Sequence, residues 1–144
     1  MIQVGRAAEA ETVDLIVDAA NVVGSVPDGW WRDRAAAVSR LRDLLVPLAG
    51  QPLGVRAPDA APPWVTATPV NVVLVVEGAA RSVQSVPGVQ VVAAAGSGDD
   101  TITELAGEAA ARRRRCVVVT ADRELRERVR DVGAVAVGPR TVYP

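Results

Sequence analysis

Acidic residues recur shortly after the most apolar stretches of this 144-residue sequence. They are Asp18, Glu77, the doublet Asp99 and Asp100, and Asp122. Carboxylates that converge without a cation repel one another, which raises their pKa values. Hard divalent cations such as Mg²⁺ or Mn²⁺ prefer oxygen ligands and relieve this repulsion. A bound ion of this kind can also activate a water molecule and stabilise an in-line displacement at phosphorus. The acids therefore predict a Mg²⁺ or Mn²⁺ site that hydrolyses phosphate esters, if the fold brings them together.

The residue types that are missing narrow the chemistry further. The sequence contains no His and a single cysteine, Cys116. These absences exclude Ser-His-Asp and Cys-His catalysis, an imidazole general base, and a zinc site built from His and Cys. Catalysis would have to rely on carboxylates, hydroxyls, Arg side chains and a metal ion. We expect Cys116, at the start of an apolar run, to be a small core residue.

Continuous runs of β-branched residues predict the strands that would position the acids. These runs are 13–17, 70–76, 89–93, 116–119 and the shorter 134–137. They show no alternation of polar and apolar residues, which is typical of strands buried on both faces of a sheet. Helices are predicted between them at 34–48, 99–114 and 122–132, with a short helix at 79–85.

Alternating strands and helices with short connections predict a three-layer α/β/α fold with a central, mostly parallel sheet of about five strands, a Rossmann-like architecture. In such sheets ligands bind at the carboxyl ends of the strands, near the point where the strand order reverses. Each acid follows a predicted strand, so all of them are expected at this edge. Residues 1–12 are expected to form an N-terminal arm, and 13–144 a single domain with a Pro-rich loop at 50–69.

Composition limits the partners that the chain can have. The net charge of −1 gives no overall attraction to nucleic acid, so any RNA contact must be local. No apolar run is long enough to span a bilayer and no secretory signal is visible, so we expect a cytoplasmic protein without membrane contact. All 16 basic residues are Arg, a bias that indicates a GC-rich bacterial genome.

A structural interpretation of the acids competes with the functional one. Aspartate is a common helix N-cap, and Asp99 and Asp122 both stand where a helix is expected to begin. Each acid taken alone is more often structural than catalytic. Their coincidence at one edge of the predicted sheet favours a common function.

Three short segments resemble the motifs of NYN-type PIN-like ribonucleases. They are VDAANVV at 17–23, GDDTI at 98–102 and VVVTADREL at 117–125. Their order and spacing cover essentially the whole predicted domain. The resemblance implies a PIN-like fold in which Asp18, Asp99 and Asp122 are the catalytic, metal-binding acids. It also implies that Asn21 orients the site and that Thr120 hydrogen-bonds a ligand or a water molecule.

Two positions depart from the family pattern. The second strand of these ribonucleases often ends in Asp, whereas here it is followed by Glu77. The doublet leaves the choice of ligand open, and we favour Asp99 because Ile102 then takes the apolar position three residues later. Asp100 would project about 100° around the helix, as a cap or a supporting acid. Glu77 and Asp100 therefore stay as additional candidate metal ligands.

A tryptophan-rich segment and a run of arginines are the candidates for RNA contact. In the segment 30–34, Trp31 and Arg32 are predicted to bind RNA, because aromatic rings stack on bases and guanidinium groups bind phosphates. In the alternative interpretation, Trp30 or Trp31 packs the loop onto the hydrophobic core. We expect one of the two to pack there and the other to be exposed near the acidic edge. The run 112–115 lies at the end of its helix remote from Asp99, so we interpret it as a solvated surface.

Together these observations predict a metal-dependent endoribonuclease with RNA as its partner. Two alternatives stay open. One is a hydrolase that acts on the phosphate or pyrophosphate bonds of free nucleotides, and the other is a non-catalytic RNA-binding or interaction module with the same fold. The sequence also leaves open a homodimer and a protein partner such as an antitoxin.

Overall fold

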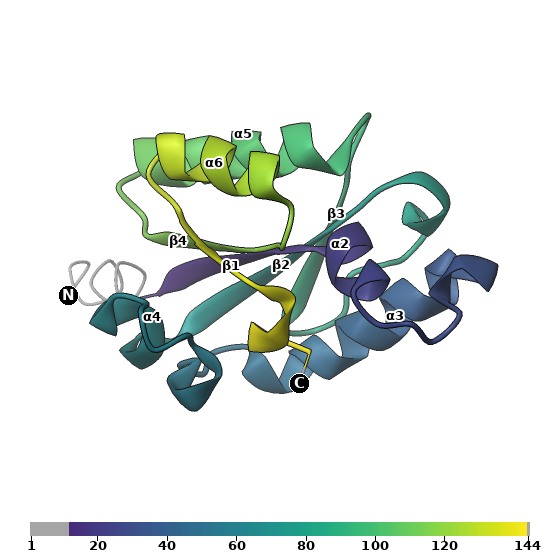
Figure 1. The fold of residues 1–144 in the computed structure, drawn as a ribbon, viewed down its shortest axis with the longest axis horizontal. Helices are drawn as coiled ribbons and strands as arrows, with labels where there is room; N and C mark the ends of the chain where they lie inside the picture. The colour runs from purple at the N-terminus through teal and green to yellow at the C-terminus, as the bar shows by residue number, and fades with distance from the viewer. Residues whose placement is uncertain (1–11, 144) are drawn as a thin grey trace.

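The five predicted strands form one parallel sheet. The computed structural model describes residues 12–143 (Figure 1). The strands are β1 (Val13–Asp18), β2 (Val70–Val76), β3 (Val89–Ala93), β4 (Cys116–Val119) and β5 (Val135–Val137). Their order in the sheet is β3-β2-β1-β4-β5, and every neighbouring pair is parallel. β1 is therefore the central strand, with β2 on one side and β4 on the other.

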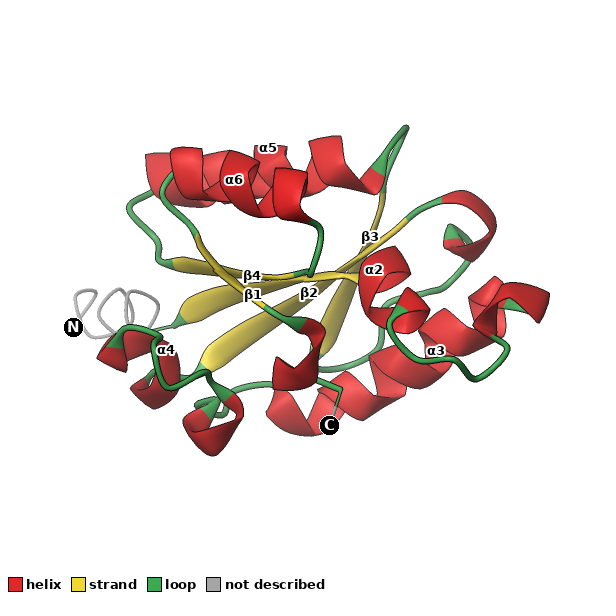
Figure 2. Ribbon diagram, viewed as in Figure 1, coloured by secondary structure: helices red, strands yellow, loops and turns green. Residues whose placement is uncertain are grey.

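Helices cover both faces of the sheet, which confirms the three-layer α/β/α architecture (Figure 2). The helices are α2 (Ala19–Gly24), α3 (Arg34–Leu45), α4 (Pro63–Ala67), α5 (Gly98–Ala111) and α6 (Arg123–Asp131). α5 and α6 lie side by side over one face, and α3 covers the other face together with α2 and α4 (Figure 1). Within residues 12–143, no helix is long and apolar enough to cross a membrane.

The side chains of β1 alternate between the two faces of the sheet. Leu15 and Val17 pack in the apolar cluster beneath α3, whereas Ile16 packs in the cluster beneath α5 and α6. Because both faces are covered by helices, both need apolar side chains, and this explains the unbroken β-branched runs. By the same alternation, Asp18 at the end of β1 and Thr120 just beyond β4 belong to the face covered by α5 and α6.

Several local elements differ from the sequence-based expectation. α2 is absent from the predicted elements, because six residues are too few to show a helical period. The helix predicted over 79–85 does not form, and only a 3-10 turn is present at Gly78–Ala80. α3 ends before Pro47, which lies in the 3-10 turn that follows. The Pro-rich segment 50–69 contains α4 and a further 3-10 turn.

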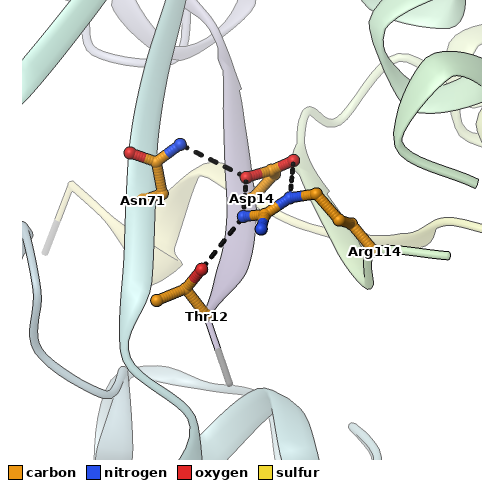
Figure 3. A network of polar contacts seen from close by, with 4 residues as sticks. All are labelled: Thr12, Asp14, Asn71 and Arg114. Atoms are coloured by element: carbon orange, nitrogen blue, oxygen red, sulfur yellow. Dashed lines mark hydrogen bonds and ion pairs between the residues drawn. The ribbon is translucent and has the colours of Figure 1, made fainter. Parts of the chain in front are cut away.

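The arginine run after α5 is not simply a solvated surface, because Arg114 turns toward β1. Its guanidinium donates to the two carboxylate oxygens of Asp14 at 2.6 and 3.0 Å and to the hydroxyl of Thr12 at 3.0 Å (Figure 3). The Asn71 side chain of β2 donates to the same carboxylate at 3.2 Å. Asp14 faces α5, so its charge needs partners there. Thr12 is the first described residue, and the rest of the predicted arm, 1–11, lies outside the described residues.

Replacing Arg114 by Met is expected to lower the free energy of unfolding by about 2 kcal/mol, because the half-buried Asp14 carboxylate then loses its cation. Urea unfolding at neutral pH measures the change. Arg112→Met, at an exposed position of the same run, is the matched control and should change the free energy by less than about 0.5 kcal/mol. Equal effects of the two substitutions would show that the ion pair contributes no stability.

Candidate functional site

The acidic residues gather at the carboxyl edge of the sheet, where β1 and β4 are neighbours. The chain leaves β1 for β2 and β3 on one side and then forms β4 and β5 on the other. The strand order therefore reverses between β1 and β4, the point at which open α/β sheets form their ligand crevice. Val17 pairs with Val119 in the register of these two strands. The next residues along, Asp18 and Thr120, consequently lie beside each other.

Thr120 joins the two strand ends. It is 0% exposed, and its hydroxyl donates to Asp18 Oδ2 at 2.9 Å. The same hydroxyl accepts a hydrogen bond from the backbone N–H of Asp122 at 3.2 Å. Asp18 Oδ1 accepts from the backbone N–H of Asn21 at 3.3 Å, so that Asp18 is also the N-cap of α2. Both oxygens of the Asp18 carboxylate are held, which fixes its orientation.

Asn21 ties α2 to the loop that precedes α6. Its Oδ1 accepts a hydrogen bond from the backbone N–H of Ala121 at 2.8 Å. Arg126 supports this loop from α6 by donating to the carbonyl oxygens of Thr120 at 3.0 Å and Ala136 at 3.5 Å. Asn21 thereby connects the end of β1 to the loop between β4 and α6.

Asp99 and Asp122 both lie at helix starts, but only Asp122 is a cap. Asp122 Oδ1 accepts from the N–H of Leu125 at 3.0 Å, so the structural interpretation holds for that oxygen. In α5 the cap is Ser97, whose hydroxyl accepts from the N–H of Asp100 at 3.2 Å. Asp99 is therefore not required as a cap, and within residues 12–143 its half-buried carboxylate has no hydrogen-bond partner.

The two additional candidate ligands have different surroundings. Glu77 accepts a hydrogen bond from the backbone N–H of Gly98 at the start of α5. A Cβ atom at Gly98 would lie 2.5 Å from Glu77 Oε2, so any other residue at this position would require the end of the Glu77 side chain to move. Asp100 instead pairs with Arg128 of α6 at 3.0 Å and is exposed. The structure thus brings Glu77 to the acidic edge and leaves Asp100 on the surface between α5 and α6.

Burial raises the pKa of Asp18 to about 6, from an ordinary value of 3.8. The hydrogen bonds from Thr120 and Asn21 oppose this rise, because they stabilise the ionised carboxylate. The negative charges of Asp99 and Glu77 add to it. Within residues 12–143, Asp18 is therefore a carboxylate whose charge has two hydrogen-bond donors but no cation that lowers its pKa.

Asp99 has the same acidic surroundings. Burial raises its pKa above the usual range, and the charges of Asp122 and Glu77 raise it further, while Arg128 opposes the rise. The negative charges of Glu77 and Asp122 thus lie close enough to raise the pKa of Asp99, as expected for acids at one sheet edge. A cation at this edge would relieve their repulsion.

These acids do not form a finished metal site. Among the residues that the structure describes, no group of three or more acidic or Cys side chains is placed to hold a metal ion. The all-oxygen donor set nevertheless fits Mg²⁺, which usually binds one or two carboxylates and completes its shell with waters and substrate phosphates. Asp99 and the second oxygen of Asp122 are the readiest donors, because no hydrogen bond within the described chain engages them. The ligand set drawn from the sequence stays a prediction.

The tandem tryptophans take two different positions, as the sequence predicts. Trp30 is half-buried and packs against the core, whereas Trp31 is 55% exposed. Their rings meet edge to face with centroids 6.1 Å apart. The guanidinium carbon of Arg32 lies 5.9 Å from the Trp31 ring centroid. Trp31 and Arg32 are accordingly accessible to a ligand.

Two arginines near this edge are not among the residues predicted for the site. Arg34 and Arg81 line a cavity that also includes Glu77 and Ser97. Arg34 belongs to the aromatic and basic segment 30–34, and that composition is the signal that points to it. Arg81 follows β2 in a turn and carries no signal in the sequence, because only the fold brings it to the acidic edge.

Comparison with known proteins shows the fold. No protein-family model matches the sequence, and no curated protein matches it. Among solved structures, the chain is similar to Rae1 (YacP) from Bacillus subtilis, with a TM-score of 0.65 and 16% sequence identity. The match covers 91% of this chain and 72% of the Rae1 chain. The chain therefore shares the α/β fold of Rae1, built here on a five-stranded parallel sheet.

Proposed function

We propose that this chain is a metal-dependent endoribonuclease whose active site is the carboxyl edge of the sheet. The observation that carries the proposal is Asp18, buried at the switch point between β1 and β4 with both oxygens held and other carboxylates nearby. A buried acid among like charges costs stability, and such arrangements concentrate at functional sites. The resemblance of three segments to NYN-type ribonuclease motifs and the fold shared with Rae1 support the same conclusion.

Each residue of the acidic edge has a proposed role. Asp18, Asp99 and Asp122 would hold Mg²⁺ or Mn²⁺, with Glu77 as a further oxygen donor. The ion would supply a water of lowered pKa and offset the charge that develops at the phosphate. Thr120 keeps Asp18 oriented through its hydroxyl, which donates a hydrogen bond to Asp18 Oδ2.

The exposed residues Trp31 and Arg32 would contact the RNA. Trp31 offers a face on which a base can stack, and Arg32 offers a guanidinium for a backbone phosphate. Neither contact reads a particular base, so these residues would add affinity rather than sequence preference.

The doublet at the start of α5 gives a matched test of the proposal. Asp99→Asn is expected to lower kcat for cleavage of a single-stranded RNA at least about 100-fold, because it removes an oxygen donor that forms no hydrogen bond within residues 12–143. Asp100→Asn removes the same charge one residue away, and it should keep activity within about threefold, since its carboxylate pairs with Arg128 at the surface. End-labelled RNA incubated with Mg²⁺, Mn²⁺ or EDTA provides the assay. Full activity of Asp99→Asn would contradict its proposed role.

One observation favours the non-catalytic alternative: no ready-made group of metal-binding side chains is present within residues 12–143. That alternative predicts RNA binding that EDTA does not change and no cleavage under any condition. Gel-shift and cleavage assays on the same RNA, with and without EDTA, separate the two functions. Faster release of phosphate from free nucleotides than cleavage of RNA would instead favour a nucleotide hydrolase.

A further inference from the structure

A cavity of about 330 Å³ opens beside the acidic edge, among α2, α3 and the loops that follow β2 and β3. Its lining includes Ala19, which directly follows Asp18, and Glu77, which lies at the acidic edge itself. A volume of this size is at the lower end of the range found for small-ligand pockets. The cavity therefore adjoins the proposed active site at Glu77 and is large enough for part of a substrate.

The lining of this cavity differs in charge from the acidic edge. Trp30 and Val38 supply an apolar wall, and Arg34 and Arg81 supply two guanidinium groups. Within residues 12–143, neither arginine forms an ion pair with a carboxylate. Glu77 is the acidic group of the lining. The cavity thus combines an aromatic surface with two cationic groups that form no ion pair with any described residue.

The two guanidinium groups are positioned by contacts that leave their charge unpaired. The guanidinium carbon of Arg34 lies 5.5 Å from the ring centroid of Trp30. Arg81 donates to the carbonyl oxygens of Ala95 and Gly96 at 3.3 and 3.4 Å. A carbonyl oxygen orients a guanidinium but does not cancel its charge, so Arg81 can still attract an anion.

We propose that this cavity binds the nucleotide next to the cleaved phosphodiester, with its base against Trp30 and a backbone phosphate between Arg34 and Arg81. The inference rests on the proposed function and adds the subsite that positions the substrate. An indole surface stacks on any base, and guanidinium groups pair with phosphate oxygens in a defined geometry. RNA is an anion that the carboxylates of the acidic edge repel, so it needs cationic anchors beside them. Arg34 and Arg81 are the cationic groups that line the adjoining cavity.

Binding to the cavity can be tested without catalysis. In EDTA, 5′-AMP and 5′-UMP are titrated into the ¹⁵N-labelled protein, and the indole N–H signals of the tryptophans are followed by NMR. The Trp30 signal is expected to shift in a saturable way with both nucleotides. The signal of Trp64, on α4 and outside the cavity, is the internal control and should stay in place.

Substitutions of the anchors test the phosphate contact. Arg34→Gln and Arg81→Gln should each raise the Kd for the mononucleotides and the KM for an oligoribonucleotide roughly tenfold, with a smaller effect on kcat. Arg40→Gln removes the same charge from an exposed position of α3 outside the cavity, and it should change both constants less than about twofold. Both anchors are exposed, so the variants should fold normally, which the unchanged Trp64 signal verifies.

The outcomes separate this inference from the proposed function. In one result, the wild type cleaves RNA while nucleotides leave the Trp30 signal unchanged and both anchor variants keep the wild-type KM. This result would overturn the proposed subsite but not the proposed nuclease activity. The opposite result is a saturable shift of the Trp30 signal that the anchor substitutions weaken, in a protein that cleaves no RNA. It would support the nucleotide subsite and refute the proposed nuclease activity.

Discussion

Asp18→Asn is expected to lower the rate of RNA cleavage at least about 1,000-fold and, without metal, to make the protein more stable at neutral pH. Activity is lost because the substitution removes the charge of the buried acid at the switch point. Stability is gained because the pKa of Asp18 is about 6 in the folded protein, against an ordinary value of 3.8. Asparagine keeps the shape of the side chain and can still accept the hydrogen bond from Asn21, but it carries no charge to bury.

The raised pKa of Asp18 sets the sign of the pH dependence. Below about pH 4 the carboxyl is protonated in both the folded and the unfolded chain, and its contribution to stability is fully present. As the pH rises from about 4 to about 6, the folded protein retains a proton that the unfolded chain has released, so the wild type loses stability. Above about pH 6 the loss is complete and amounts to about 3 kcal/mol. The advantage of Asp18→Asn over the wild type should therefore grow across this window and then stay constant.

Urea unfolding in EDTA at pH 4 and pH 7.5, together with a cleavage assay, measures both effects of Asp18→Asn. The control is Asp131→Asn, at an exposed position at the end of α6, which should keep full activity and show no stabilisation at neutral pH. Millimolar Mn²⁺ is expected to raise the Tm of the wild type but not that of Asp18→Asn. Cleavage by Asp18→Asn would refute the assignment of the site, and a variant less stable than the wild type at pH 7.5 would refute the energetic cost of the buried charge.

Thr120→Val is expected to lower the free energy of unfolding by about 2 kcal/mol and to move the activity–pH profile to higher pH. Valine matches threonine in shape but has no hydroxyl, so Asp18 Oδ2 loses a donor and the N–H of Asp122 loses an acceptor. The hydrogen bond from Thr120 opposes the rise in the pKa of Asp18. Without it the pKa rises further, and the ionised carboxylate that would bind metal forms only at higher pH.

Two controls separate this effect from general damage to the core. Thr120→Ser restores the hydroxyl and should return the pH profile to that of the wild type. Thr141→Val alters another buried threonine, at 3% exposure, and should leave the profile in place whatever its effect on stability. An unshifted profile for Thr120→Val would show that the hydroxyl has no influence on the ionisation that controls activity.

The acidic edge itself can be predicted from the sequence. The runs that become β1 and β4 are largely apolar and followed at once by Asp18 and Thr120, so their ends can be located without a structure. Parallel strands place these ends at one edge, and the hydrogen bond between the two side chains confirms that they meet there. The local sequence pattern is sufficient to locate these two residues, because each directly follows an apolar run and the end of that run fixes its position.

Contacts that depend on the relative placement of distant elements cannot be predicted in this way. The pairing of Arg114 with Asp14 joins residues 100 positions apart, and it requires both the face of β1 and the direction of the chain after α5. Arg81 reaches the cavity through a turn whose course no periodicity describes. The pairing of Asp100 with Arg128 likewise depends on how α5 packs against α6, which the sequence pattern does not describe.

The central strand β1 is the first of the described strands along the chain, but both of its neighbours come much later. β2 begins at Val70 and β4 at Cys116, and Thr120 reaches Asp18 across 102 positions of sequence. Pairings over such distances are slow, because a long loop must close before they form. A polypeptide still growing on the ribosome carries Asp18 long before Thr120 and Asp122 have been synthesised. A protein proposed to cut RNA would therefore lack part of its proposed site until residue 122 has been synthesised.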